Sequence, residues 1–397
     1  MPHLSDRIAN LHESATIKMA QLGRELKAQG HDIISLSLGE PDFVTPKHIC
    51  EAAKKAIDEG FTFYTAVPGT IELRKAIQAK FKRDNGLDYT PEQIVVSTGA
   101  KQSLINVVLC LVNPGEEVIV PAPYWVSYAA MVELAEGKMV NIFTTIDQDF
   151  KITAEQLEAA ITPKTRMVMF SSPCNPSGSV YTKEELAGLA KVLAKHPEIY
   201  VVSDEIYEYI NFDGKHESIA QFPEIYNQTI TVNGFAKGFA MTGWRVGYIG
   251  APLWIAKACD KLQGQFTSAT CSIAQKAAEA ALNGDMQPSY DMRDQFHRRR
   301  DMVIALLSEI PGLKTNTPPG AFYLFPDVSA YFGKTYNGEV LKDADDLSLY
   351  LLAEAHVALV SGAAFGSPEC VRISYAASDK QLVEACARIK AALEKLV

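Results

Sequence analysis

The chain has 397 residues, of which 47% are hydrophobic and 21% are charged. This is the composition of an ordinary globular protein, and the length exceeds the roughly 250–300 residues at which one hydrophobic core stops growing, so we expect two domains. The 38 basic and 47 acidic residues leave a net charge of −9, which argues against general binding to nucleic acid or anionic membranes.

Cysteine usage and the N-terminus indicate the compartment. The seven cysteines are scattered and never spaced as CxxC, so we expect neither a disulfide framework nor a metal site. The N-terminus shows no signal-peptide pattern, and no apolar run approaches the roughly 20 residues that cross a bilayer. We therefore predict a cytoplasmic protein without a membrane segment.

Helix-start signals recur in the first half of the chain. Thr45-Pro46 predicts a cap and a first-turn proline for a helix that Gly60 closes. Capping boxes are predicted at Thr90 with Gln93, Thr153 with Gln156, and Thr182 with Glu185.

Short β-branched runs lie between these helices. They are nearly continuous in apolar character rather than alternating, which is typical of a mostly parallel sheet covered by helices on both faces. The predicted strands are 94–97, 117–123, 166–173, 200–205, 229–235 and 245–252.

The last hundred residues have a different pattern. They begin with a long charged helix over 292–310 and end with an amphipathic helix over 379–397, with candidate strands between them at 320–329, 356–365 and 371–377. We expect a large domain over 46–289 and a smaller α+β domain made of 1–45 and 290–397.

Polar residues gather just after the predicted strands. In open parallel sheets ligands bind beyond the carboxyl ends of the strands. The residues at these ends are Gly99, Ala100 and Lys101 after the first strand, then Asn175, Asp204, Tyr207 and Lys237.

Ten motifs run in one order along nearly the whole chain. They are SATIKM, LSLGEPDF, FTFYTAVPGTIELR, STGAKQ, APYWVSY, SSPCNPSG, SDEIYE, VNGFAKGFAMTGWRVGY, GAFY and VRISYA. In these motifs the chain resembles the bacterial branch of the aspartate-aminotransferase family of fold-type-I pyridoxal-phosphate enzymes. The resemblance implies an α/β fold, in which a large domain holds a mostly parallel seven-stranded sheet beside a smaller α+β domain, and the cofactor pyridoxal 5'-phosphate.

The resemblance also implies roles around the cofactor. Lys237 would form an imine with the cofactor aldehyde and move a proton during catalysis. Asp204 would hold the ring nitrogen protonated. Tyr207 and Asn175 match donors to the phenolate oxygen, and Trp125 matches the aromatic residue against the ring.

The cofactor phosphate needs several donors. The amides of Gly99, Ala100 and Lys101 at a helix N-terminus form an anion site, to which Arg245 adds a charged pair. Tyr64 resembles the tyrosine that reaches the phosphate of a neighbouring subunit, so we expect a homodimer with shared active sites. Unlike many relatives, the chain has no hydroxyl residue at positions 234 and 236, which are Gly234 and Ala236.

Substrate recognition is predicted from the same resemblance. Arg372 matches the arginine that grips the α-carboxylate, and the backbone of Gly39 lines that pocket beside Trp125 and Asn175. A lysine in the place of Lys101 recognises a distal carboxylate in the bacterial branch, which favours aspartate and glutamate. His12 and Glu13 depart from the branch's usual basic residue and proline, so the side-chain specificity stays open.

We therefore predict an aminotransferase that moves the amino group of an L-amino acid, with aspartate preferred, to 2-oxoglutarate. The exchange would be ping-pong, through Lys237 and pyridoxamine phosphate, with small amino and 2-oxo acids as the partners. Prephenate or broader aromatic specificity is the alternative. Another pyridoxal-phosphate reaction such as a C–S lyase, or a regulator that keeps the cofactor as a ligand, are rival hypotheses.

Overall fold

A seven-stranded sheet forms the middle of the protein, whose residues 4–9, 11, 13 and 15–397 are described by a computed structural model. The strand order is β2-β8-β7-β6-β5-β3-β4, and β8 alone among them runs antiparallel to its neighbours. The predicted mostly parallel α/β fold is confirmed. The strands are β2 (Ile94–Ser97), β3 (Glu117–Ala122), β4 (Lys138–Phe143), β5 (Thr165–Ser171), β6 (Tyr200–Asp204), β7 (Thr229–Gly234) and β8 (Gly247–Gly250).

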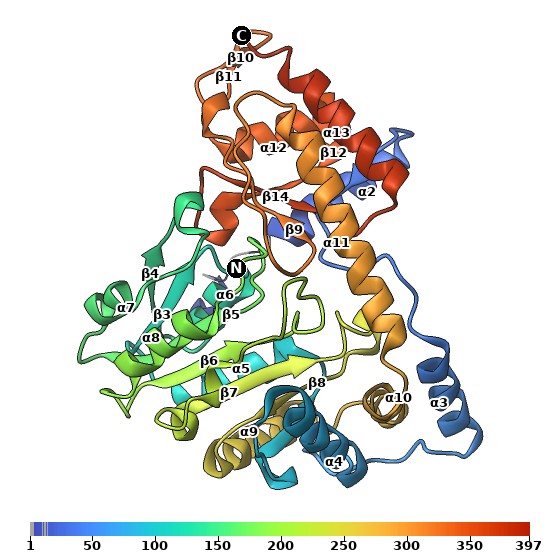
Figure 1. Cartoon of the computed structure of the whole chain (residues 1–397), viewed down its shortest axis with the longest axis vertical. Coiled ribbons are helices and arrows are strands. Elements are labelled where there is room, and N and C mark those ends of the chain that lie inside the picture. Colours follow the sequence, from blue (N-terminus) through green and yellow to red (C-terminus); the bar gives the residue numbers. More distant parts are fainter. Residues whose placement is uncertain (1–3, 10, 12, 14) are drawn as a thin grey trace.

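Helices cover both faces of this sheet (Figure 1). Val202 of β6 packs in one hydrophobic cluster with α5 (Ala100–Leu111) and α9 (Leu253–Phe266), while its neighbour Val201 packs with α7 (Ala154–Ala160) and α8 (Lys183–Leu193). Successive side chains of a strand point to opposite faces. Apolar side chains at both positions therefore bury both faces, which explains the continuous apolar runs.

Two local features differ from the sequence-based expectation. The edge strand β4 is half exposed, so its sequence KMVNIF carries no continuous apolar signal. At α3 (Lys47–Asp58) the N-cap is Pro46 rather than Thr45, whose hydroxyl donates instead to the carbonyl of Ala240. The capping boxes at Thr153 and Thr182 are confirmed at the starts of α7 and α8.

The last third of the chain builds a second hydrophobic core, which we call the C-terminal core. Phe296, Val303, Phe322, Leu347 and Leu382 are among its buried members. Its elements are α11 (Gln287–Ser308), α12 (Ala344–Glu354), α13 (Asp379–Leu393), β9 (Tyr323–Leu324), β12 (Val357–Ala358), β13 (Val360–Ser361) and β14 (Val371–Ser374).

The N-terminal segment joins the C-terminal core. β1 (Ile34–Ser35) pairs in parallel with β12, and α2 (Ala15–Ala28) lies beside them (Figure 1). The helix α11 runs from the sheet side into the C-terminal core. The predicted domain boundaries at 45/46 and 289/290 stay a prediction. The remaining elements are α1 (Asp6–Ala9), α4 (Ile71–Lys80), α6 (Ser127–Leu134), α10 (Ser272–Asn283), β10 (Thr335–Tyr336) and β11 (Glu339–Val340).

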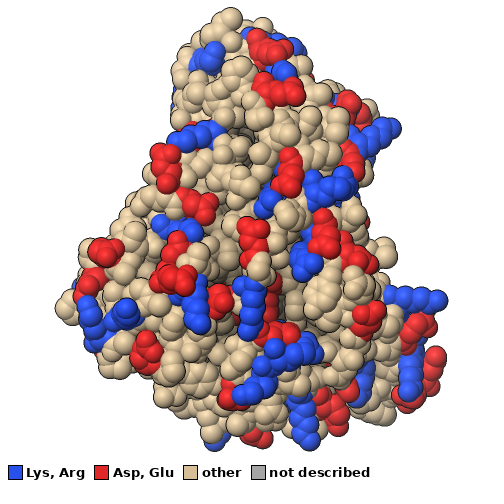
Figure 2. Space-filling view, viewed as in Figure 1, with Lys and Arg blue, Asp and Glu red and all other residues tan. Residues whose placement is uncertain are grey.

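Acidic and basic side chains are interspersed over the face seen in Figure 2. Across the part of the chain that the structure describes, no helix combines the length and apolar character needed to span a bilayer.

Candidate active site

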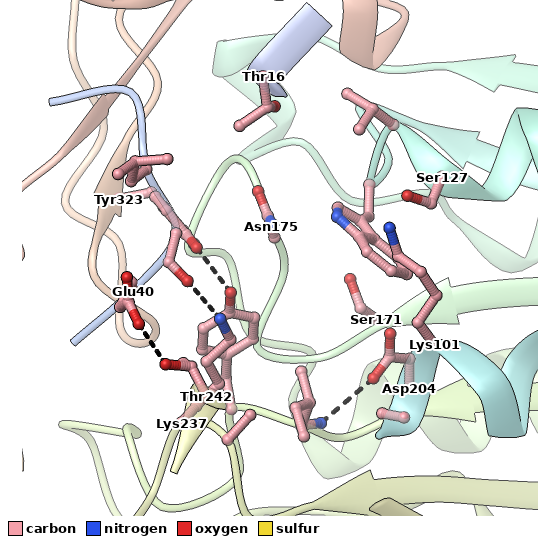
Figure 3. A pocket seen from close by; sticks show the side chains of 18 of the residues that line it. Thr16, Glu40, Lys101, Ser127, Ser171, Asn175, Asp204, Lys237, Thr242 and Tyr323 are labelled. Carbon is pink, nitrogen blue, oxygen red and sulfur yellow. Dashed lines mark hydrogen bonds between the residues drawn. The ribbon is translucent and has the colours of Figure 1, made fainter. Parts of the chain in front are cut away.

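A cavity of about 360 Å³ opens where the strands β2, β5, β6 and β7 end (Figure 3). These strands are parallel to one another, so the segments that follow them meet at one edge of the sheet. Residues from the N-terminal segment and the C-terminal core complete the wall. The predicted residues that line the cavity are Gly39, Ala100, Lys101, Trp125, Asn175, Asp204, Tyr207, Lys237, Arg245 and Arg372.

Lys237 follows β7 and is partly exposed to the cavity. Its amine donates a hydrogen bond to the backbone carbonyl of Gly39. Burial lowers the pKa of Lys237 to about 8, the charge of Arg372 acts in the same direction, and Glu40 opposes both. A substantial fraction of this amine is therefore neutral, and so nucleophilic, near neutral pH.

Asp204 ends β6 and is almost fully buried. The hydroxyl of Tyr128 donates to its Oδ2 at 2.8 Å, and the amide of Ile206 donates to Oδ1 at 3.3 Å. Burial raises the pKa of Asp204 to about 6, and the two hydrogen bonds counteract that rise. A cationic group of a ligand in the cavity would therefore stabilise the ionised carboxylate by forming an ion pair with it.

An anion-binding cradle lies at the start of α5. Gly99 is the N-cap, with a φ of 86°, and a Cβ at this position would overlap the guanidinium of Arg245. The first amides of a helix lack intrahelical acceptors and face outward with the positive end of the helix dipole. Ala100, Lys101 and Arg245 line the cavity, while Gly99 lies behind the arginine.

Arg372 lies on β14 and is buried. It donates to the side chain of Asn175 at 2.9 Å and to the carbonyl of Ser37 at 2.5 Å, and its guanidinium packs 4.7 Å from the ring centroid of Tyr323. Its Nε has no hydrogen-bond partner among the described residues. Burial lowers the pKa of Arg372, so a carboxylate in the cavity would restore the lost solvation of its charge.

Two aromatic contacts shape the remaining walls. The hydroxyls of Tyr207 and Tyr323 lie 2.6 Å apart. The amine of Lys101 lies 5.0 Å from the ring centroid of Trp125, and burial, followed by the charge of Arg245, lowers the pKa of Lys101. The Lys101 side chain lines the cavity while it stays exposed to solvent, so it presents a cation to an anionic ligand group.

Two predicted residues do not line the cavity. Gly99 is packed against Arg245, and Tyr64 is 96% exposed. Ala236 is a lining residue, so this position presents only a methyl group to the cavity. His12 lies outside the described residues.

Sequence reasoning assigned no role to several residues that the structure brings into the site. Thr16, Glu40, Thr242 and Tyr323 line the cavity, and Tyr128 contacts Asp204 behind it. Each lies within one of the ten shared motifs, which was the available signal. Their roles depend on contacts between distant segments, such as that of Glu40 with Thr242, which motif reading alone does not reveal.

This donor set fits pyridoxal phosphate. A buried amine, a buried carboxylate and a helix N-terminus with an arginine match in turn an aldehyde, a ring nitrogen and a phosphate. Tyr207 and Asn175 line the cavity between these groups. The fit rests on three separate chemical features, each contributed by a different strand end.

Comparisons with known proteins identify the family of this chain. The profile of the family described as "Aminotransferase class I and II" matches residues 31–389. The chain is 49% identical over 394 residues to an aspartate/prephenate aminotransferase of Cereibacter sphaeroides, covering 98% of each chain.

Solved structures agree as well. The aspartate aminotransferase of Rhizobium meliloti superposes with a TM-score of 0.97 at 44% identity, with both chains fully covered. The enzyme of Thermus thermophilus with maleate gives a TM-score of 0.92 at 40% identity, over 99% of this chain and 100% of that one. The cavity, its amine and these similarities agree, and the chain belongs to the class I and II aminotransferase family, whose members depend on pyridoxal phosphate.

Proposed function

We propose that this aminotransferase moves the amino group of L-aspartate to 2-oxoglutarate, with Lys237 as the residue that carries the cofactor. The observation that carries the proposal is the joint presence of the Lys237 amine, the Asp204 carboxylate and the Arg372 guanidinium around one cavity. An amine for covalent attachment, a carboxylate for the cofactor and a cation for the substrate are the groups that transamination needs.

The cofactor-facing residues follow from their chemistry. When bound, pyridoxal phosphate supplies an aldehyde that condenses with amines and a ring that accepts electrons from the substrate's α-carbon. Asp204 would hold the ring nitrogen protonated through an ion pair. Tyr207 and Asn175 would donate hydrogen bonds to the phenolate oxygen, and Trp125 would pack against the ring.

Lys237 also acts as the proton carrier. Once exchange with the substrate frees its amine, the lowered pKa leaves that amine partly neutral at physiological pH. It would then take the proton from the substrate's α-carbon and deliver it to the carbon that the cofactor supplies as an aldehyde. The matched pKa makes both directions accessible to one group.

The phosphate is held by backbone amides and a guanidinium. Gly99, Ala100 and Lys101 present the N-terminus of α5, and Arg245 adds a charged donor beside them. We propose that Tyr64 of the partner subunit supplies a further hydroxyl, so that the active unit is a homodimer with shared sites. The exposure of Tyr64 in the single chain supports this assignment.

The substrate is held at both ends. Arg372 binds the α-carboxylate, beside the backbone of Gly39 and the side chains of Trp125 and Asn175. Lys101 binds the distal carboxylate. The maleate in the structure of the Thermus thermophilus relative supports a dicarboxylate ligand.

With domains at 46–289 and at 1–45 plus 290–397, Lys237 and Arg372 belong to different domains. We propose this division because β14, which carries Arg372, packs in the C-terminal core, whereas Lys237 follows a strand of the main sheet. Substrate binding would then bring the two domains together.

Prephenate is the second candidate amino acceptor. The relative from Cereibacter sphaeroides is named an aspartate/prephenate aminotransferase, and it matches 98% of this chain. Prephenate also carries two carboxylates, so Arg372 and Lys101 could each form an ion pair with one of them.

The test is a product assay with purified holoenzyme, aspartate and 2-oxoglutarate, followed by prephenate and aromatic 2-oxo acids as acceptors. We expect oxaloacetate and glutamate in equal amounts, with Lys237→Ala as the inactive control. Lys101→Ala should lower kcat/KM for dicarboxylates more than for monocarboxylates. Release of ammonia or carbon dioxide without amino-group transfer would reject the proposal.

A further inference from the structure

Glu40 lies beside Lys237 at one side of the cavity and is joined to Thr242 by a hydrogen bond (Figure 3). The hydroxyl of Thr242 donates to the Glu40 carboxylate across 202 positions of sequence. Thr242 begins the short 3₁₀ helix that ends just before Arg245, and its carbonyl accepts from that arginine at 2.9 Å. Glu40 is thus connected, through one residue, to the guanidinium of the anion cradle.

The segment that carries Glu40 is attached to the C-terminal core on both sides of it. Before it, the amide of Leu36 donates to the carbonyl of Ala358 at 2.9 Å, and the carbonyl of Ser37 accepts from Arg372. After it, Asp42 accepts from Arg299 of α11 at 2.7 Å.

Three residues after Asp42, the chain contacts the segment that follows Lys237 instead of the C-terminal core. The hydroxyl of Thr45 donates to the carbonyl of Ala240 at 2.7 Å and accepts from the indole of Trp244 at 3.0 Å, so Thr45 is fixed to the segment that follows Lys237. Val44, between the two sets of contacts, is 91% exposed. The contact of Glu40 with Thr242 therefore joins the C-terminal core to the segment after Lys237, and Val44 lies on one of the two covalent connections between these parts, the other being α11.

The charge of Glu40 acts on Lys237. Burial and then Arg372 lower the pKa of Lys237, and Glu40 gives the largest of the contributions that raise it. The carboxylate of Glu40 can exert this effect only from a defined position, because it lies at the exposed edge of the cavity where water screens charges.

We propose that Glu40 is a positioning residue for the reaction: Thr242 holds its carboxylate beside the Lys237 amine, and the approach of the C-terminal core that follows carboxylate binding at Arg372 strengthens this contact. The inference rests on the proposed role of Lys237. It adds an acidic residue and a hydroxyl that communicate substrate binding to the amine, with bending at Val44.

The test uses the absorbance of the holoenzyme, whose cofactor band changes with pH as the nitrogen shared by Lys237 and the cofactor gains or loses its proton. Glu40→Gln keeps an oxygen acceptor for Thr242 but removes the charge, so the titration midpoint should fall by about 0.5 to 1 pH unit. Thr242→Val should shift it in the same direction, and Thr242→Ser should restore it. Glu51→Gln on the exposed face of α3 is the matched control and should titrate as the wild type.

A second measurement adds saturating maleate, which has neither an amino nor an oxo group. The change in midpoint that maleate causes should be smaller in Glu40→Gln than in the wild type. If Glu40→Gln and Thr242→Val both titrate with the midpoint of the wild type, the positioning role is overturned. If maleate changes the midpoint equally in Glu40→Gln and in the wild type, or changes it in neither, the coupling to substrate binding is overturned. A wild-type protein that shows no pH-sensitive cofactor band would instead reject the proposed role of Lys237, so the two failures are distinguishable.

Discussion

Tyr128 donates a 2.8 Å hydrogen bond to Asp204, and both side chains are buried behind the cavity. Tyr128 lies in the first turn of α6, and Asp204 ends β6, so two different elements of the large sheet layer form the pair. Burial raises the pKa of Asp204 to about 6, and the bond from Tyr128 is the largest of the effects that lower it. The ionised state of Asp204 near neutral pH therefore depends strongly on one phenol.

Replacing Tyr128 with Phe should move the acid limb of the kcat/KM profile to higher pH. A hydrogen bond to a charged group contributes roughly 1.5 kcal/mol, which corresponds to about one pH unit. We expect about a sixfold loss of kcat/KM at pH 6, where half of the wild-type carboxyl is ionised, and little change at pH 8. Tyr181→Phe removes another buried hydroxyl, which accepts from the amide of Ile152, and should leave the profile in place. If Tyr128→Phe lowered kcat/KM by the same factor at all pH values, the prediction would be contradicted.

Lys237 is expected to destabilise the cofactor-free protein. Its pKa is lowered to about 8 from an ordinary 10.5, so the folded state binds this proton more weakly than the unfolded chain does. The cost is complete below pH 8 and disappears as the pH rises towards 10.5. Lys237→Met should therefore raise the midpoint of thermal unfolding at pH 7, with a gain that narrows by pH 10, while turnover falls at least about a thousandfold.

Thermal unfolding of cofactor-free proteins at both pH values checks this prediction. Lys164→Met, at an exposed position, is the control, and it should change the midpoint of thermal unfolding by the same small amount at pH 7 and pH 10. A gain for Lys237→Met that does not vary with pH would contradict the assigned cause.

Arg372→Lys should impair substrate binding although the charge is kept. A lysine cannot hold both Asn175 and the carbonyl of Ser37 while pairing with a carboxylate, because it lacks the planar fork. The loss of bidentate pairing, worth about 3 kcal/mol, predicts a drop in kcat/KM for aspartate of about a hundredfold. Arg388→Lys, in an exposed ion-pair group with Asp32, should have little effect in the same steady-state assay. Equal effects of the two substitutions would refute the role of Arg372.

Tyr64 can be tested with mixed dimers. Lys237→Ala and Tyr64→Ala subunits are each expected to be weak alone. If Tyr64 acts across the interface, a heterodimer of the two gathers both defects in one site and leaves the other intact, so about half of the wild-type activity per dimer should return. Refolding the two variants together, with purification of heterodimers by two different tags, gives the measurement. No recovery of activity would show that Tyr64 does not act across the interface.

Lys80 is a structural cation in the large sheet layer. It is fully buried, pairs with Glu208 and donates to Asn85 at 2.7 Å. Lys80→Met leaves the Glu208 carboxylate without its cation, which predicts a loss of roughly 3–5 kcal/mol in unfolding free energy. Denaturant unfolding should also show that Glu208→Gln added to Lys80→Met recovers part of the loss. Lys82→Met, which removes an exposed pair with Asp88, should change stability by less than about 1 kcal/mol.

The sequence predicted the buried central strands of the sheet but not its edge strand β4. Buried strands such as β3 carry apolar residues at successive positions, here Val118, Ile119 and Val120, because helices cover both faces of the sheet, and this signal is strong in a single sequence. β4 was missed because an edge strand with one half-exposed face mixes Lys138 and Asn141 among its apolar residues. Thr45 has the sequence of a helix cap, but its hydroxyl is engaged by the distant Ala240, and tertiary contacts override local preference.

In the candidate site, too, some residues could be predicted from the sequence and others could not. Lys237, Asp204 and Asn175 were predicted because each lies at or just after a strand end within a motif shared with the family, and the fold brings strand ends together. Tyr128 was missed because its hydroxyl acts on Asp204 from 76 positions away, and no local pattern encodes that contact. Pairwise contacts between distant segments require the folded chain.

The bond from Arg372 to the carbonyl of Ser37 spans 335 positions, so this wall of the cavity is assembled from segments that are far apart in the sequence. During synthesis the strands of the main sheet, together with Lys237, leave the ribosome well before Arg372 does. On the proposed role of Arg372, a growing chain that has already formed the sheet would lack the guanidinium that binds the amino acid. Substrate binding would become possible only after residue 372 has been synthesised and has paired with Ser37.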